Sequence, residues 1–367
     1  MKEAVNFEEA HDTIFSGALE LLKQLITISS FSKEEDKTAD AIENFLKERN
    51  IKANRYLNNV WAVNKYFDEK KITVLLNSHH DTVKPNAGYT IDPFSPIEKD
   101  GKLFGLGSND AGGPLVSLIA TFVNFYNEEN LPFNLILAAT AEEEISGHDG
   151  IEILLPQLPK IDCGIVGEPT LMNMAIAEKG LLVLDCIAHG VAGHAARNEG
   201  VNAVYKAMKD IEWLSTFQFE KTSPFLGPVH IAVTSINTQN KAHNMVPSEC
   251  SFTVDIRVNE FYSFDEIINE IQKNTTSEIM PRSTRLKPSF IGESHPLVMA
   301  GSSMALTSYG SPTCSDRALM NFPTLKLGPG DSARSHSADE YIFKDEIKDG
   351  IKKYILLLQN LSKALLK

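Results

Sequence analysis

The 367-residue chain is poor in cysteine and has no cysteine motif. No C-x-x-C pair occurs among its four widely spaced cysteines, which are Cys163, Cys186, Cys250 and Cys314. Neither a disulfide framework nor a thiolate zinc site is therefore indicated. Three of the four lie in apolar, strand-like runs and the last in a polar turn, so we expect buried or inert thiols.

The sequence also lacks long apolar runs and an excess of basic residues. No segment approaches the roughly 20 apolar residues of a membrane-spanning helix. The first residues, MKEAVNFEEAHD, carry acids where a secretory signal carries a basic patch. The formal net charge of −13 disfavours nucleic acid and anionic membranes as partners. We therefore expect a cytoplasmic protein with no nucleic-acid or membrane partner.

The composition is that of a globular protein large enough for two domains. Hydrophobic residues make up 43% and charged residues 23% of the chain, which excludes a disordered or fibrous protein. Because single cores stop growing at roughly 250–300 residues, two domains are expected.

The apolar pattern of the first half predicts an α/β domain. Short continuous apolar runs are typical of strands buried on both faces of a largely parallel sheet, and three occur: 72–77, 133–139 and 162–167. Helices are expected at 12–27, 114–128 and 345–366. Ser32 and Glu35 form a capping-box pattern that predicts a further helix ending near Glu48.

The pattern changes near Gly180 and returns to α/β after about residue 289. In between, strands such as 230–236 and 250–258 alternate apolar and polar residues, which predicts an antiparallel sheet covered on one face. Helices are expected near 201–215 and 263–273. The sequence thus predicts a discontinuous main domain, 1–178 and 290–367, with an inserted α+β domain at 179–289.

Polar motifs follow the predicted strands of the main domain. His79 and Asp81 end the first strand and share a face, so the histidine could bind a metal while Asp81 accepts its other ring N–H. Alone, this H-x-D is weak, and a satisfied structural histidine is the simpler interpretation.

Four further motifs are each ambiguous alone. Asp110 lies in a glycine-rich segment that could be a plain turn or a phosphate loop, although no Lys-Ser/Thr follows it. Glu142, Glu143 and Glu144 could form a solvated acidic loop. The last two motifs are G-E-P-T with Glu168 and S-H-S-A-D-E with His336. Together the five motifs offer two histidines and three carboxylates, a full ligand set for two zinc-like ions bridged by one carboxylate.

The order H-x-D, G-x-G…D, E-E, G-E-P-T and a late histidine resembles the metallo-aminoacylase family that contains acetylornithine deacetylase, succinyl-diaminopimelate desuccinylase and carboxypeptidase G. The resemblance covers nearly the whole chain. It implies a zinc-exopeptidase-like catalytic domain with an inserted lid and dimerisation domain, a homodimer formed through that domain, and two divalent ions. Zinc is the expected metal, with cobalt or manganese as alternatives.

The same resemblance implies a role for each motif. Asp110 bridges the two ions, His79 and Glu168 bind one, and Glu144 and His336 bind the other. Glu143 is the general base and Asp81 orients His79. The Asp110-Ala111 peptide is expected to be cis.

Residues of the inserted domain are implied as well. His194, in G-V-A-G-H-A-A, is expected to polarise the scissile carbonyl in the site of a partner subunit. Asn244 and Arg257 match substrate-contacting positions, and a guanidinium suits a carboxylate. In the main domain, the loop Gly328-Pro329-Gly330 is expected to hold the substrate's α-carboxylate with a small nest of backbone N–H groups.

The chain departs from many relatives at two positions, with Gly112 where they carry lysine and Glu142 where they carry aspartate. The function implied is hydrolysis of an N-acyl amino acid. N-acetylornithine, a substrate of arginine biosynthesis, is the first expected substrate. N-acetylcitrulline, N-succinylornithine, succinyl-diaminopimelate and dipeptides are the alternatives. A non-catalytic metal-binding protein of the same fold is the competing class.

Overall fold

The computed structural model describes residues 2–366, with side chains from residue 11 onward, and the chain forms two compact units. The larger unit comprises the chain up to Ile176, Ile291–Tyr309, and the chain from Ser315 onward. The smaller comprises Ala177–Phe290 and Gly310–Cys314. The insertion expected at 179–289 lies within the smaller unit, which also includes a second, short segment.

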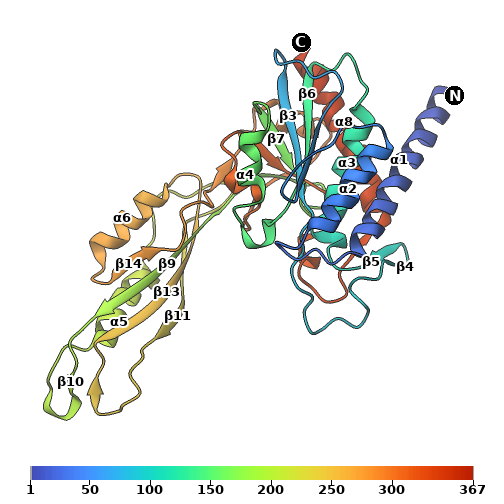
Figure 1. The fold of residues 1–367 in the computed structure, drawn as a ribbon. Helices are drawn as coiled ribbons and strands as arrows, with labels where there is room; N and C mark the ends of the chain where they lie inside the picture. The colour runs from blue at the N-terminus through green and yellow to red at the C-terminus, as the bar shows by residue number, and fades with distance from the viewer. Residues whose placement is uncertain (1, 367) are drawn as a thin grey trace. The chain divides into compact units, whose positions relative to one another are not determined.

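A mixed sheet forms the centre of the larger unit (Figure 1). Its strands follow the order β1-β2-β6-β3-β7-β17-β8, and β16 pairs with β8. Strand β15, whose residues belong to the smaller unit, pairs with Ala177 and Glu178 at the end of β8. Their bounds are β1 (Asn54–Tyr56), β2 (Asn59–Val63), β3 (Ile72–His79), β6 (Phe133–Thr140), β7 (Cys163–Val166), β8 (Met174–Glu178), β15 (Ser289–Phe290), β16 (Ser308–Ser311) and β17 (Thr324–Lys326).

Strand direction corrects one prediction. The neighbours β6, β3, β7 and β17 are parallel, whereas β2 joins β6, and β8 joins β17, in the antiparallel direction. The expectation of a largely parallel sheet is therefore right for the centre and wrong for the flanks.

Helices cover both faces of this sheet. Figure 1 shows α1, α3 and α8 on one side and α4 on the other. Leu75 of β3 and Ile136 of β6 pack with Ile151 and Leu154 of α4. Helix α3 is buried along almost its whole length because it packs against the helices α1 and α8 and against strand β3. The helices are α1 (Lys2–Ile26), α2 (Asp36–Glu48), α3 (Gly113–Phe125), α4 (Ile151–Leu154), α7 (Pro296–Ser302) and α8 (Lys344–Leu365).

The predicted capping box before α2 does not form. The helix begins at Asp36, and its N-cap makes no side-chain hydrogen bond to the helix. The Ser32 hydroxyl instead donates to Asp81 Oδ2 at 2.7 Å, and Glu35 Oε1 accepts the Glu142 N–H at 3.2 Å. Both side chains therefore contact the motifs singled out in the sequence.

A small three-stranded sheet joins distant segments of the larger unit. Its order is β18-β5-β4, with β4 (Ile97–Lys99), β5 (Lys102–Phe104) and β18 (Tyr341–Phe343). Because β18 pairs with β5, the residues before β18 are drawn to the glycine-rich segment that follows β5.

The smaller unit is an antiparallel sheet with two helices. Its strands follow the order β11-β13-β9-β14, and β9 and β13 alternate buried and more exposed residues, as their sequence pattern predicts. Its elements are β9 (Gly180–His189), β10 (Gly193–His194), β11 (His230–Asn237), β12 (Met245–Val246), β13 (Glu249–Val258), β14 (Glu278–Pro281), α5 (Ala203–Thr216) and α6 (Phe264–Asn274).

Within residues 2–366, no helix combines the length and apolar character that crossing a bilayer requires.

Candidate metal centre

The carboxyl ends of three neighbouring parallel strands bring three of the motifs together. His79 closes β3 in register with Thr140, the last residue of β6, and β7 lies on the other side of β3. Each strand is followed directly by its polar motif, so Glu142–Glu144 and Glu168 emerge at the same edge of the sheet as His79.

His79 lies at the centre of a group of carboxylates. Its side chain is 1% exposed, and its Nε2 lies 3.4 Å from Asp110 Oδ1, 3.8 Å from Glu168 Oε1 and 3.9 Å from Glu143 Oε2. The ligand atoms of His79, Glu143 and Glu168 all lie within 4.8 Å of one another, as do those of His79, Asp110 and Glu144. Glu143 therefore lies among the potential ligands.

The two oxygens of Asp110 face different histidines. Oδ1 faces His79, whereas Oδ2 lies 3.7 Å from Nε2 of His336. His336 Nε2 also lies 3.0 Å from Glu144 Oε2. A carboxylate with its two oxygens directed to different histidines could contact two cations.

The electrostatics of the group fit cation binding. Burial and the nearby charge of Glu168 raise the pKa of Glu143 well above its ordinary value. Burial alone would lower the pKa of His79, but Asp110 and Asp81 outweigh it and raise that pKa well above the usual range. The hydrogen bond to Glu144 raises the pKa of His336 to about 9. The carboxylates thus favour a positive charge at this position. Imidazole and carboxylate groups are donors that suit zinc, cobalt and manganese.

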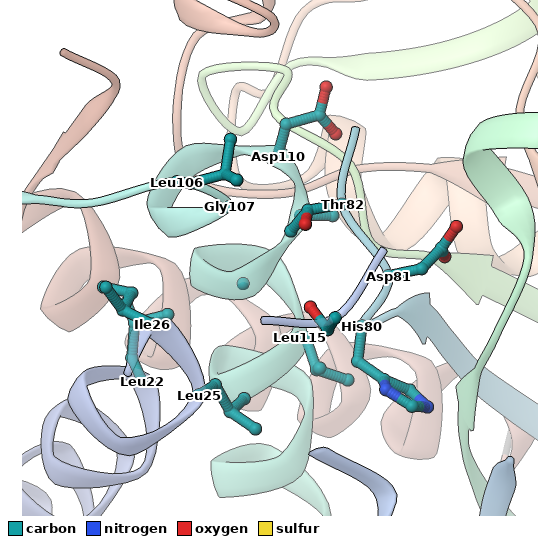
Figure 2. Close-up of a pocket in the computed structure, with 13 residues that line it drawn as sticks. Leu22, Leu25, Ile26, His80, Asp81, Thr82, Leu106, Gly107, Asp110 and Leu115 are labelled. Carbon is teal, nitrogen blue, oxygen red and sulfur yellow. The ribbon is translucent and has the colours of Figure 1, made fainter. Parts of the chain in front are cut away.

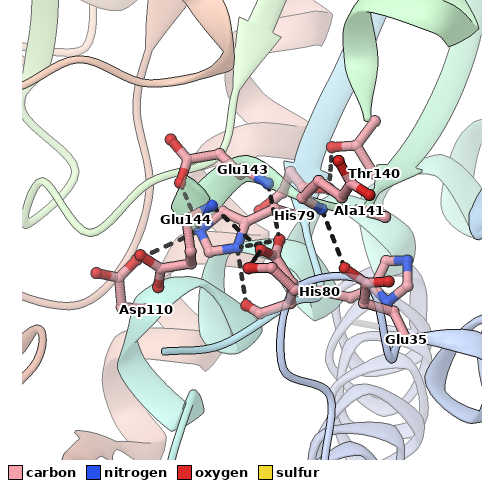
Figure 3. Close-up of polar contacts among 12 residues, drawn as sticks. Glu35, His79, His80, Asp110, Thr140, Ala141, Glu143 and Glu144 are labelled. Carbon is pink, nitrogen blue, oxygen red and sulfur yellow. Dashed lines mark hydrogen bonds and ion pairs between the residues drawn. The ribbon is translucent and has the colours of Figure 1, made fainter. Parts of the chain in front are cut away.

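Asp81 links His79 to the acidic turn, whose Glu143 and Glu144 lie beside His79 in Figure 3. His79 Nδ1 lies 3.0 Å from the Asp81 backbone carbonyl and 3.3 Å from its Oδ1. The Asp81 carboxylate also accepts the backbone N–H groups of Glu143 and Glu144, both at 3.1 Å. One buried carboxylate therefore contacts the imidazole and fixes the turn that carries two acids of the group.

His80 has a different environment from its neighbour. Its Nδ1 lies 2.9 Å from Thr38 Oγ1 and its Nε2 lies 2.9 Å from the Asn58 carbonyl. Burial lowers the pKa of His80 to about 4. We conclude that His80 is a structural histidine, in agreement with the alternation along the strand.

Glycines of the segment that carries Asp110 leave no room for a side chain. Its Asp110-Ala111 peptide is cis, which confirms the expectation from the resemblance. Gly107 has a φ of +73°, which favours glycine. A Cβ on Gly112 would lie 2.4 Å from the Gly107 carbonyl oxygen and 2.6 Å from Leu22 Cδ1, so the lysine of many relatives does not fit here without movement.

Beside this segment lies a cavity of about 20 Å³. Leu22, Leu25, Thr82 and Leu115 are among its lining residues (Figure 2). This volume has room for about one water molecule, so it is too small for a substrate.

Three buried acids near the centre are not among the site residues predicted from the sequence. Glu340, 2% exposed, accepts backbone N–H groups of the segment that carries Asp110. Glu35 holds the backbone of Glu142. Asp316 accepts the Thr140 hydroxyl at 2.7 Å, and burial raises the pKa of Asp316 to about 6. Glu340 belongs to a motif that the sequence did single out, whereas the pattern around Asp316 gives no signal.

The expected anion nest in the larger unit is only partly available. The Gly328 N–H donates to Thr170 Oγ1 at 3.0 Å, and Pro329 has no N–H. Two of the three residues of the loop Gly328-Pro329-Gly330 therefore cannot offer an N–H to a carboxylate, which corrects that part of the prediction.

Three expected site residues belong to the smaller unit. His194 is exposed on β10, and its Nδ1 accepts the Ala196 N–H at 3.2 Å. Asn244 is exposed, and its carbonyl accepts the N–H of Ala195, the neighbour of His194, at 3.0 Å. Arg257 on β13 contacts Asp255 through its Nε at 2.8 Å.

Comparison with known proteins finds a matching family model and similar sequences. A family model described as peptidase family M20/M25/M40 matches residues 75–360. A succinyl-diaminopimelate desuccinylase 2 from a Ruegeria species is 26% identical over 276 residues, covering 70% of this chain and 69% of the relative. A succinyl-diaminopimelate desuccinylase from Orientia tsutsugamushi is 25% identical over 353 residues, covering 89% and 85%.

Solved structures share the fold. An aminopeptidase, PepT, from Bacillus cereus superposes with a TM-score of 0.77 at 15% identity, covering 95% of this chain and 98% of that structure. A Bacillus subtilis protein described as a dinuclear metal-binding peptidase from the M20 family superposes with a TM-score of 0.74 at 12% identity, covering 97% and 99%.

Proposed function

Because the chain belongs to peptidase family M20/M25/M40 and is a metallohydrolase of amide bonds, we propose that it uses two metal ions to remove the acyl group from the nitrogen of a small amino-acid derivative. The observation that carries the proposal is the placement of Asp110, with one oxygen toward His79 and the other toward His336. Side chains from all five motifs meet around this carboxylate: His79, Asp110 itself, Glu143 and Glu144, Glu168, and His336.

In the proposed centre, His79 and Glu168 would hold one cation, Glu144 and His336 would hold the other, and Asp110 could serve both. Zinc is the proposed metal, and cobalt and manganese accept the same donors. The structural neighbour described as dinuclear supports the number of ions.

When bound, the cations lower the pKa of a water molecule and polarise the substrate carbonyl. Glu143 accepts a proton from the water while the water oxygen attacks the carbonyl carbon. Glu143 then donates that proton to the departing nitrogen. The C–N bond breaks, and a carboxylic acid and a free amine result. Asp81 holds His79 and the backbone of Glu143 in place through this cycle.

The proposed substrate is a succinylated diamino acid of the succinyl-diaminopimelate type. N-acetylornithine is the first substrate expected from the resemblance, but the relatives compared above are desuccinylases and favour one of the alternatives. The link to arginine biosynthesis loses its support for the same reason. N-acetylornithine, N-acetylcitrulline and N-succinylornithine are the alternative substrates to be tested beside it.

The remaining roles are proposals carried over from the resemblance. We propose a cytoplasmic homodimer formed through the smaller unit, in which His194 of the partner subunit polarises the scissile carbonyl. Asn244, Arg257 and the loop Gly328-Pro329-Gly330 are proposed to contact the substrate.

The test is metal analysis of the purified chain followed by a hydrolysis panel, with and without a chelator. The panel contains succinyl-diaminopimelate, the acetyl and succinyl derivatives of ornithine and citrulline, and dipeptides. We expect two ions per chain and chelator-sensitive release of succinate. Two bound ions without hydrolysis of any compound would instead favour a metal-binding protein that does not catalyse.

A further inference from the structure

Glu340 binds the backbone of the segment that supplies Asp110. Its Oε1 accepts the N–H of Asn109 at 2.8 Å and that of Asp110 at 2.9 Å, and its Oε2 accepts the N–H of Gly107 at 3.0 Å. The side chain is buried, so water does not compete for these donors. Three backbone donors thus converge on one carboxylate.

The same segment of chain carries His336. Glu340 lies four positions after this histidine, and its own carbonyl accepts the Gly105 N–H at 3.0 Å. Asn109 adds a reciprocal pair with Asp331, because its amide donates to the Asp331 carbonyl and accepts the Asp331 N–H, both at 3.0 Å. These contacts tie the segment of Asp110 to the segment of His336.

We propose that Glu340 is a positioning residue of the metal centre, which fixes the backbone of Asp110 relative to His336 so that the Asp110 carboxylate can serve both cations. The inference rests on the proposed function. Glu340 contacts no cation or substrate itself and acts through the segment that it binds. Partners that orient metal ligands in this way typically change metal affinity by about 10–100-fold when they are replaced.

The alternative is that Glu340 only stabilises the fold. A purely structural role predicts a lower melting temperature with unchanged cation affinity once the chain is folded. A positioning role predicts weaker cation binding and a changed ligand geometry at temperatures where the variant is fully folded.

The neighbouring Asp339 offers a matched control. It is also a carboxylate that accepts backbone N–H groups, but from Thr90 at 2.8 Å and Ile91 at 3.3 Å, away from the segment of Asp110. Replacing Glu340 by glutamine keeps the shape and turns one oxygen into an N–H donor, which cannot accept the bonds made there. Asp339→Asn makes the same chemical change nearby.

The experiment titrates cobalt into metal-stripped full-length protein and follows heat and visible absorption. We expect wild type and Asp339→Asn to bind two ions with the same affinity and spectrum. Glu340→Gln should bind at least one ion about 10–100-fold more weakly, with a shifted spectrum. If Glu340→Gln does not fold, Glu340→Asp, which withdraws the carboxylate by one methylene, should show a weaker loss of the same kind.

The outcomes separate the two proposals. A wild type that binds two ions, with a folded Glu340 variant of identical affinity and spectrum, would overturn this inference alone. A wild type that binds no cobalt would overturn the proposed function and this inference with it.

Discussion

The imidazole Nε2 of His336 lies 3.0 Å from the Oε2 of Glu144, although 192 positions separate the two residues. Glu144 follows β6 in the central sheet, whereas His336 comes from the loop before β18. Asp110 completes the group, because its Oδ2 also faces His336. The pairing of β18 with β5 and the contacts of Glu340 bring the segment of His336 to that of Asp110. We propose a shared ligand as the reason why three polar side chains then converge at one point.

Replacing His336 by alanine should remove one of two cations. The variant loses the imidazole that faces Glu144 and Asp110 but keeps His79 and Glu168. We expect one ion per chain in place of two, measured by elemental analysis after dialysis. His148→Ala is the control, since His148 is 74% exposed and pairs only with Glu152 among the ion pairs of the described residues. A His336→Ala chain that still held two ions would refute this ligand assignment.

Replacing Glu143 by glutamine should slow turnover severely and spare the metals. The amide cannot carry the proton from water to the leaving nitrogen, so kcat should fall by about 100- to 10,000-fold with the metal content unchanged. Glu152→Gln, the same change on α4, should retain the wild-type rate. Loss of an ion from the Glu143 variant would show that this side chain is a ligand, which its distance from His79 also permits.

Mixing two inactive variants tests whether His194 acts on a partner's site. His194→Ala alone should lower kcat about 100- to 1,000-fold, as loss of one oxyanion donor does elsewhere. In a mixed dimer with Glu143→Gln, one site has its own Glu143 and an intact partner histidine. Random exchange should therefore restore about a quarter of the wild-type activity, measured after unfolding and refolding the mixture. No recovery, with mixed dimers shown to form, would contradict action in trans.

Replacing the buried Arg317 by methionine should destabilise the larger unit. Its guanidinium donates to the backbone carbonyls of Ala175 and Ile176, both at 2.7 Å, and methionine leaves these acceptors without that donor. We expect a loss of about 2–5 kcal/mol in the free energy of unfolding.

Urea unfolding followed by fluorescence measures this loss. Trp61 reports on the larger unit when Trp213, which lies in the smaller unit, is replaced by phenylalanine. Lys47→Met, which removes an exposed pair with Glu43 on α2 of the larger unit, should change stability by at most about 1 kcal/mol. Equal effects of the two substitutions would contradict the argument from burial.

Sequence reasoning predicted the parts of the site that follow central strands. His79, Glu144 and Glu168 each come directly after an apolar run, and the ends of parallel strands meet at one edge of a sheet. The structure brings them together there. Asp110 and His336 lie on loops, and their place in the set came from the resemblance because no periodicity fixes where a loop goes.

Local patterns misled where a tertiary contact prevails. Ser32 and Glu35 have the spacing of a capping box, yet their side chains bind Asp81 and the backbone of Glu142. The fully buried β8 has the same apolar pattern as β7 but runs in the other direction relative to β17, because burial on both faces carries no information about direction. Glu340 is the last residue of the motif S-H-S-A-D-E, but its backbone partners are more than 200 positions away, so no local pattern indicates them.

The most direct test of the two-ion centre is anomalous diffraction at the zinc edge from crystals of the wild-type chain grown with zinc. We predict two peaks about 3.5–4 Å apart, one on each side of the Asp110 carboxylate, the first beside His79 and Glu168 and the second beside Glu144 and His336. A single peak, or zinc bound away from these side chains, would contradict the account.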